Sequence, residues 1–239
     1  MSAAAPGPAL SAVFDVLFPQ VCGGCGCELP VGRGAVPLCG RCRRLLAAEQ
    51  RRPRGHCSRC GVPVLPEQEV PCLHCRDRDL VFASHEALFD YRGLARELLR
   101  QFKFSGRIGF ARLFAELLAP RVDAVYRDCT VVPVPARGRR VRSHGYDAVD
   151  LVVRQLAAAH GCRTERLLRR RGGRQLKGLG RAQRRASIAG RLRLLRPPPP
   201  RPVLLIDDVY TTGATAGECA AVLVAGGASE VRVLTLAQD

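Results

Sequence analysis

The chain has 239 residues, of which 47% are hydrophobic, and a formal net charge of +17. This length allows a sizeable core and a small additional module, and no stretch approaches the ~20 uninterrupted apolar residues of a membrane-spanning helix. The apolar stretch 9–18 contains Asp15 and follows no basic residue, so it does not resemble a secretory signal. We therefore expect a soluble, cytoplasmic protein in which residues 9–18 form a short amphipathic helix.

Cysteines dominate the first third of the chain. Nine of the twelve precede residue 76, and eight of these form Cys-x-x-Cys pairs: Cys22/Cys25, Cys39/Cys42, Cys57/Cys60 and Cys72/Cys75. Each pair places two thiolates on a tight turn, and two such turns complete a tetrahedral zinc site. The pairs predict one or two structural zinc sites, formed either by neighbouring pairs or by a cross-braced arrangement.

Other interpretations of these cysteines are weaker. A disulfide framework needs an oxidising compartment, which nothing in the sequence indicates, and repeated pairs fit structural metal better than a redox motif. His74 could replace one of the ligands. The unpaired cysteines are expected to be ordinary packed thiols: Cys27, Cys129, Cys162 and Cys219. Because the segment is poor in apolar residues, metal would substitute for a core. We place a zinc-binding module at residues 1–80 and a second domain at residues 81–239.

The second domain begins with an extended segment, residues 82–91, and two helical patterns. The apolar spacing from Leu94 to Phe102 predicts a helix with Lys103 at its end, and a second amphipathic stretch from Phe110 to Leu118 is expected to end at Pro120. The chain has only two lysines against 36 arginines. Lys103 is therefore a candidate for a task in which a point charge differs from a guanidinium.

A short buried strand is expected from Thr130 to Pro135, followed at once by a cluster of arginines. Glycine, prolines and arginines at a strand end suit a loop that grips diphosphate oxygens, with Arg137 and Arg139 as candidates, although a plain surface turn also fits. An amphipathic helix is expected over residues 146–159.

Residues 137–201 carry a net charge of +16, nearly all of the total of +17. Such a density of charge attracts polyanions, although a solvated basic surface is the simpler alternative. Within this stretch, the glycine-rich residues 169–181 predict a mobile loop. It would act either as a lid over a departing diphosphate or as an arginine-glycine segment that follows a nucleic-acid backbone.

The most informative segment begins with the apolar run from Val203 to Ile206, which lacks alternation and suits a parallel strand buried on both faces. Asp207 and Asp208 follow directly, at the edge where ligands bind in open α/β sheets. The next loop offers backbone N–H groups and hydroxyls, and a helix over residues 216–225 would point its positive end at a phosphate. The loop residues are Thr211, Thr212, Gly213, Ala214 and Thr215. A helix cap alone would need one polar side chain, and this segment has five. A closing strand is expected over residues 231–236.

The segment from Val203 to Thr215 resembles the phosphoribosyl-diphosphate (PRPP) signature of type I phosphoribosyltransferases, in which four apolar residues precede Asp-Asp and a Thr-Thr-Gly-x-Thr loop. The resemblance implies that Asp207 and Asp208 hold the ribose 2- and 3-hydroxyls. It also implies that residues 211–215 wrap the 5-phosphate.

The order of motifs along the chain is similar to that of the ComF family, from about residue 14 onward. The motifs are the cysteine pairs, Tyr91-Arg92-Gly93, residues 102–106, Val132-Pro133-Val134-Pro135, Gln175-x-Lys177-x-Leu179 and the PRPP signature. The chain departs from the family's usual residues at His144-Gly145-Tyr146-Asp147 and at Ser187. The resemblance implies a type I phosphoribosyltransferase-like parallel sheet flanked by helices, an α/β fold, with a small zinc module at the N-terminus.

Two functions follow from this resemblance. In the first, Mg²⁺ and PRPP bind, Asp207 and Asp208 orient the ribose for phosphoribosyl transfer to a nitrogen acceptor, and Lys103, Arg137 and Arg139 neutralise the leaving diphosphate. In the second, the chain is an accessory protein that binds single-stranded DNA during uptake in natural transformation, beside a helicase-like partner and a recombination mediator. With only 5% aromatic residues, the chain has few platforms for base stacking. The acceptor of the first reaction is not revealed by the sequence.

Overall fold

The computed structural model describes residues 20–30, 36–51, 55–65, 72–76, 80–136, 145–171 and 190–239. The helix expected over residues 9–18, the arginines at positions 137 and 139, and most of the glycine-rich loop lie outside these residues. Among the described residues, no helix is long and apolar enough to cross a membrane.

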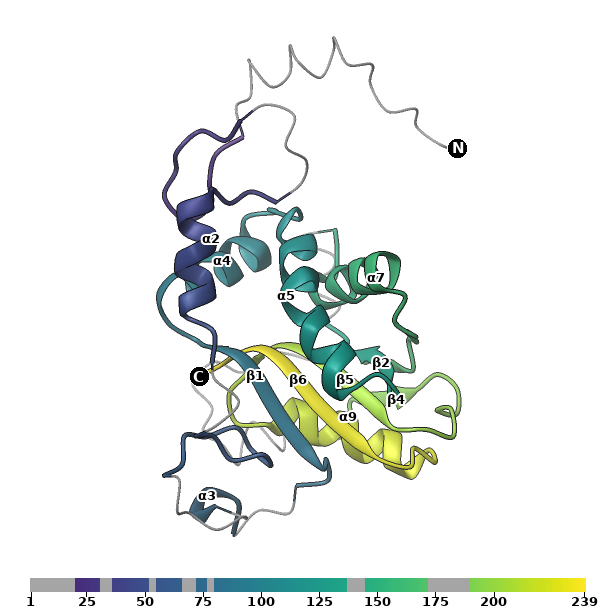
Figure 1. The fold of residues 1–239 in the computed structure, drawn as a ribbon. Coiled ribbons are helices and arrows are strands. Elements are labelled where there is room, and N and C mark those ends of the chain that lie inside the picture. Colours follow the sequence, from purple (N-terminus) through teal and green to yellow (C-terminus); the bar gives the residue numbers. More distant parts are fainter. Residues whose placement is uncertain are drawn as a thin grey trace, which may run out of the picture.

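A parallel sheet forms the centre of the molecule (Figure 1). Its strands lie in the order β1 (Ser84–Asp90), β6 (Val231–Gln238), β5 (Val203–Tyr210) and β2 (Thr130–Pro133), and every neighbouring pair is parallel. The predicted α/β fold, a parallel sheet flanked by helices, is confirmed.

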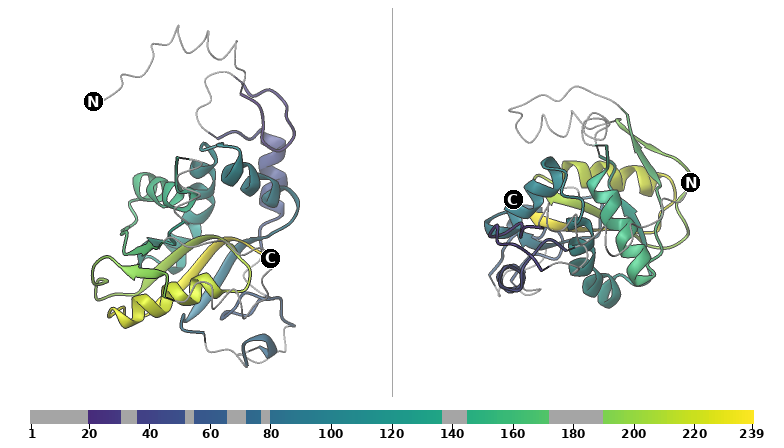
Figure 2. Two further views of the ribbon diagram at one scale, coloured as in Figure 1. Left: turned by 180° about the vertical axis from the view of Figure 1, so that it is seen from behind. Right: turned by 90° about the horizontal axis from the view of Figure 1, so that it is seen from above.

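Alternate residues of β5 enter two separate cores, which explains its unbroken apolar run. Leu204 and Ile206 pack toward α4 (Gly93–Phe104), α5 (Phe110–Val125) and α7 (Ala148–His160). Val203 and Leu205 pack toward α9 (Ala214–Ala225) and a small antiparallel sheet of β3 (Leu168–Arg170) and β4 (Leu192–Leu194). Figure 2 shows the two layers from behind and from above. Because side chains alternate along a strand, Asp207 and Asp208 must also point to opposite faces of the sheet.

Several elements run further than their patterns predicted. The expectation that Pro120 ends its helix is wrong, because α5 continues to Val125 with Pro120 exposed. Ala119 and Val122, which are 2% and 3% exposed, continue the buried face, and this packing outweighs the hydrogen bond that proline cannot make. Likewise, α9 begins at Ala214 rather than two residues later, and β5 continues past the two aspartates.

The two cysteine-rich segments pack on different parts of the sheet domain (Figure 1). The first contains α2 (Gly40–Ala48) and shares a core with α4 and α5. The second contains α3 (Leu73–Arg76) and shares the core of α9. The boundary at residue 80 between two domains stays a prediction.

Candidate functional site

Asp208 and Lys103 meet at the end of β5 although they are far apart in sequence. Lys103 lies in the last turn of α4, and its Nζ is 2.7 Å from Oδ2 of Asp208. The two side chains are 10% and 17% exposed, so the ion pair is largely shielded from water. Tyr146 donates a hydrogen bond to the carbonyl of Phe102, the residue before Lys103, and so fixes the end of that helix. The predicted presentation of Lys103 by a helix end is confirmed, with an aspartate as its partner.

Asp207 has a different electrostatic environment. Burial, followed by the neighbouring charge of Asp208, raises the pKa of Asp207 to about 8, against the opposing influence of Lys103 and Arg170. Even with these two cations nearby, the raised pKa favours the protonated form of this carboxyl group at neutral pH. A carboxyl group of this kind loses its proton when a cation or a hydrogen-bond donor arrives, which is the behaviour expected of a ligand-binding carboxylate.

The loop after β5 has a backbone that requires glycine. Gly213 has φ of +75° and precedes the first residue of α9. A Cβ atom at this position would lie 2.2 Å from the hydroxyl oxygen of Tyr210, so a side chain is excluded by contact as well as by conformation. The amide of Ala214 donates to Oγ1 of Thr212 at 3.4 Å.

The start of α9 is open to an anion. Its first turn contains no acidic residue, and Gly213 offers no side chain to cap it. Thr211 is exposed, and residues 212–215 are partly exposed. Free N–H groups at the positive end of a helix form a site for phosphate or carboxylate.

The structure therefore brings Asp207, Asp208, Lys103 and the loop from Thr211 to Thr215 to one end of β5. Arg137 and Arg139 lie outside the described residues.

Two residues that border this site were not singled out from the sequence. Asp147 caps α7 and accepts a hydrogen bond from the amide of Ala136 at 2.8 Å, so it holds the chain where the arginine-rich loop begins. Arg170 of β3 acts electrostatically on Asp207. The capping position of Asp147, at the start of a predicted helix, was the available signal for the first of these. Arg170 was placed at the start of a mobile loop over residues 169–181, and this prediction is wrong for residues 169 and 170, because they belong to β3 and pair with β4.

The first cysteine cluster differs from the predicted set of ligands by one thiol, because it contains Cys27 in place of Cys42. The sulfur atoms of Cys22, Cys25, Cys27 and Cys39 all lie within 4.8 Å of one another. Cys42, a predicted ligand, hydrogen-bonds the Cys39 sulfur through its amide and is buried, whereas Cys27 is exposed. The expectation that Cys27 is an ordinary packed thiol is therefore wrong, since it lies at the surface within the cluster. The Cys-Gly-Cys spacing that follows the first pair was the signal for it.

The second cluster matches the predicted ligands. Cys57, Cys60, Cys72 and Cys75 are all buried, and their sulfur atoms lie within 4.8 Å of one another. The distance between sulfur atoms is 3.6 Å for Cys60 and Cys72 and 4.0 Å for Cys57 and Cys75. Neighbouring pairs thus combine in sequence order, and no cross-bracing connects these two described clusters.

Two of the clustered thiols have surroundings that favour the thiolate form, whereas burial raises the pKa of a third, Cys60, to about 11. Burial tends to raise the pKa of Cys22, but backbone N–H groups of Cys39, Cys25 and Gly24 point at the sulfur and lower its pKa to about 6. Burial and backbone N–H groups act in the same opposing ways on Cys57, whose pKa falls to about 7. Thiolates with such hydrogen bonds are suited to bind divalent metal. Both cysteine clusters could therefore hold a metal ion.

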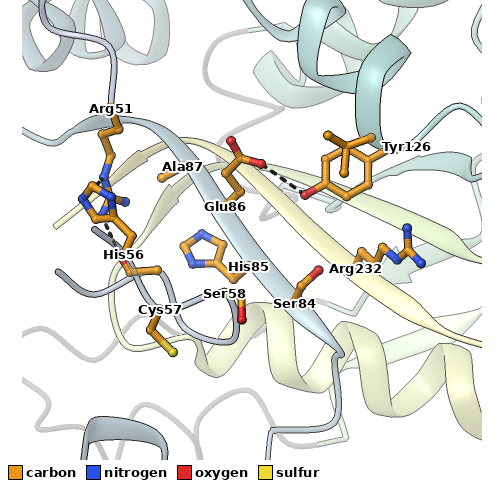
Figure 3. A pocket seen from close by; sticks show the side chains of 12 residues that line it. Arg51, His56, Cys57, Ser58, Ser84, His85, Glu86, Ala87, Tyr126 and Arg232 are labelled. Carbon is orange, nitrogen blue, oxygen red and sulfur yellow. Dashed lines mark hydrogen bonds between the residues drawn. The ribbon is translucent and has the colours of Figure 1, made fainter. Parts of the chain in front are cut away.

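A cavity of 280 Å³ lies beside β1, an edge strand of the central sheet, between the second cysteine segment and the end of α5 (Figure 3). Tyr126 points across it and donates to Oε2 of Glu86 at 3.4 Å. Arg121 pairs with the same carboxylate at 3.1 Å. The cavity is lined by none of the PRPP-signature residues.

No family model matches the chain. Curated relatives do match it over most of its length. The DNA utilization protein YhgH of Escherichia coli is 28% identical over 218 residues, which is 88% of this chain and 94% of that protein. The competence protein ComFC of Streptococcus pneumoniae is 28% identical over 182 residues, or 76% of this chain and 80% of that protein. Competence protein F of Haemophilus influenzae is 26% identical over 212 residues, or 84% and 90%. The resemblance to the ComF family is confirmed.

Solved structures similar to this ComF-like chain include phosphoribosyltransferases. The allosteric regulatory enzyme of purine biosynthesis has a TM-score of 0.37 and 18% identity, over 57% of this chain and 30% of that chain. A hypoxanthine phosphoribosyltransferase from Staphylococcus aureus has a TM-score of 0.35 and 12% identity, over 55% and 65%. At these TM-scores, the fold assignment rests on the sheet topology described above.

Proposed function

We propose that this ComF-like chain binds PRPP together with Mg²⁺ at the carboxyl end of β5 and transfers the phosphoribosyl group to a nitrogen acceptor. The observation that carries the proposal is the junction of β5 and α9. There, two carboxyl groups and the uncapped start of a helix lie within one short segment. This arrangement offers acceptors for a diol and donors for a phosphate side by side.

Each part of the site has a distinct task. Asp207 and Asp208 would accept hydrogen bonds from the ribose hydroxyls, and the amides from Gly213 onward would hold the 5-phosphate. Lys103 pairs with Asp208 and so offsets part of the repulsion between the two neighbouring acidic residues. When bound, Mg²⁺ would neutralise the diphosphate of PRPP. The carboxylates of this site that would hold the ion are Asp207 and Asp208.

The raised pKa of Asp207 should make the affinity for PRPP and Mg²⁺ depend on pH. Because burial holds this pKa at about 8, part of the ligand's interaction energy is spent on removing the proton at neutral pH. Affinity for PRPP and Mg²⁺ should therefore increase as the pH rises toward 8.

We further propose that the cysteine clusters hold structural Zn²⁺. In each cluster, thiols from two neighbouring turns converge, which is the ligand set and spacing of tetrahedral zinc sites. The zinc would stabilise two segments that contain little apolar core of their own.

Calorimetric titration with PRPP and Mg²⁺ tests the main proposal. The wild-type protein should bind, and Asp207→Asn should bind at least about tenfold more weakly, because the amide cannot accept two hydroxyl hydrogen bonds as a carboxylate does. Asp128→Asn is the matched control, since Asp128 is exposed and lies before β2 at the other end of the sheet. Equal affinities for all three proteins would reject the proposed site.

A DNA-handling role is the second candidate, favoured by the names of the relatives, which refer to competence and DNA utilization. The net charge of +16 in residues 137–201 supplies an electrostatic reason. Binding of single-stranded DNA, measured by filter retention across a salt series, should weaken steeply as salt rises. A response that does not change with salt would exclude a phosphate-following surface. A helicase-like partner and a recombination mediator remain predictions.

A further inference from the structure

The second cysteine cluster contacts the central sheet through backbone carbonyl groups, including those of Ser58 and Cys60. The carbonyl oxygen of Cys60 lies 3.1 Å from Nδ1 of His85 on β1 and 3.2 Å from Nε2 of Gln238 on β6. Arg51 donates to Oε1 of Gln238 at 2.7 Å and also to the carbonyl of Gly61. The turn that contains Cys60 is thus clamped onto the ends of two strands.

His85 has a fixed orientation in this contact. The residue is 2% exposed, and its Nε2 lies 3.0 Å from Oγ1 of Thr235. A carbonyl can only accept, so Nδ1 carries the hydrogen and donates to Cys60, while Nε2 faces the Thr235 hydroxyl, which also lies 3.1 Å from the carbonyl oxygen of Ala237. Both ring nitrogens are therefore held.

Tyr210 lies directly against this ring. The centroids of His85 and Tyr210 are 3.8 Å apart with an angle of 17° between the planes, which is a stacked pair. Phe82 contacts Tyr210 edge-on, with centroids 6.3 Å apart. Tyr210 is 4% exposed and ends β5, immediately before the loop that begins at Thr211.

The other side of Tyr210 contacts the loop itself. Its hydroxyl oxygen would lie 2.2 Å from a Cβ at Gly213, so the tyrosine fills the space that a side chain would take. The Tyr210 side chain therefore lies against the loop backbone at Gly213 and is itself stacked on His85.

We propose that the second cysteine cluster positions the phosphate-binding loop through His85 and Tyr210, which act as positioning residues. This inference rests on the proposed function of the loop. The contacts run without a gap from the Cys60 carbonyl to His85, from His85 to Tyr210, and from Tyr210 to Gly213. Metal bound by the four thiols would hold the Cys60 turn in place. This turn would in turn hold His85, Tyr210 and the loop backbone at Gly213.

The physical effect is pre-organisation. Several backbone N–H groups must point at one phosphate together, and a loop that is already ordered avoids the entropy cost of ordering on binding. If the Cys60 turn loosens, His85 can tilt, Tyr210 gains freedom, and the amides after Gly213 lose their common direction. By linkage, PRPP should in turn raise the affinity of the second cluster for its metal by the same factor as the metal raises the affinity for PRPP.

Two glycines of the second cysteine segment provide a matched pair of variants. Gly61 has φ of +72°, and a Cβ there would lie 2.6 Å from Oε1 of Gln238 and 2.7 Å from Nδ1 of His85, the two side chains that hold the Cys60 carbonyl. Gly55 has φ of +87°, and a Cβ there would meet nothing within 4 Å. Gly61→Ala and Gly55→Ala therefore carry the same kind of backbone strain, but only Gly61→Ala displaces His85, and both keep every thiol.

The first measurement is titration of the metal-loaded proteins with PRPP and Mg²⁺. Gly61→Ala should retain the metal content of the wild type and bind PRPP about tenfold more weakly, whereas Gly55→Ala should bind as the wild type does. Equal affinities of Gly61→Ala and Gly55→Ala would overturn the proposal.

The second measurement needs no ligand, so it separates this proposal from the proposed function. Hydrogen exchange of the amides at residues 211–217 should be faster in Gly61→Ala than in Gly55→Ala. Failure of the wild type to bind PRPP would reject the function and leave this comparison intact. Should Gly61→Ala lose metal or fail to fold, His85→Leu replaces it, because His85 is not a metal ligand and its loss should speed the same exchange. Unchanged exchange in the variant that folds would overturn the proposal.

Discussion

Replacing Lys103 with methionine removes one charge of the central ion pair and keeps a similar aliphatic chain. The Nζ of Lys103 lies 2.7 Å from the Asp208 carboxylate. Two unit charges at this distance attract each other by about 6 kcal/mol at an effective dielectric constant of about 20. The cost of removing both groups from water cancels much of this attraction. We expect Lys103→Met to lower the free energy of unfolding by about 2 to 3 kcal/mol, because Asp208 is left shielded from water beside Asp207 without a cation.

Urea unfolding of the metal-loaded protein at low salt measures this loss, and a double-mutant cycle with Asp208→Asn isolates the pair. Arg112→Met is the control, because Arg112 pairs with Glu116 at 2.9 Å but the two side chains are 54% and 37% exposed. The control should change the free energy of unfolding by less than about 0.5 kcal/mol. A coupling energy between Lys103 and Asp208 no larger than this would refute the reasoning that the pair is shielded and stabilising.

Three further outcomes are expected. First, burial raises the pKa of Asp207 from 3.8 to about 8, so the folded state holds this proton more tightly than the unfolded state does. The resulting contribution to the free energy of unfolding is complete below the unfolded pKa of 3.8 and is lost as the pH rises through the folded pKa of about 8. Between these two pH values, the free energy of unfolding should fall more in the wild type than in Asp207→Asn. If urea unfolding gives the same pH dependence of this free energy for both proteins, the raised pKa of Asp207 is contradicted. Second, Cys42→Ser should still bind metal at both clusters, because Cys27 supplies a fourth thiol to the first one. Elemental analysis by mass spectrometry checks this, and loss of one ion per chain would show that Cys27 cannot replace Cys42. Third, Gly213→Ala should unfold at lower urea than Gly161→Ala. Both glycines have positive φ, costing about 1 to 2 kcal/mol for alanine, but only the Cβ at position 213 meets another atom, 2.2 Å away. Equal midpoints for the two variants would contradict the close contact.

The sequence predicted the part of the site that is continuous along the chain. The apolar run before Asp207 identified β5, and the hydroxyl-rich loop around Gly213 identified the start of α9, because each signal lies within a few residues of the feature it reports. The parallel sheet followed from the same run, since only a strand covered on both faces lacks alternation.

Features that depend on distant contacts could not be predicted. Lys103 was correctly placed at a helix end, but its partner Asp208 comes from a strand more than a hundred residues later. The continuation of α5 beyond Pro120 depends on packing against α7, which overrides the local preference of proline. The stack of His85 on Tyr210 combines residues that looked unremarkable in the sequence.

The order of the strands also matters while the protein is being made. Within the described sheet, β1 pairs only with β6, and β6 is the last of the four strands in chain order. At typical ribosomal speeds, β1 emerges about ten seconds or more before its partner. During this interval, the apolar side chains of Leu88 and Phe89 have no completed sheet to cover them. The nascent chain should therefore depend on chaperones until its final strand has been translated.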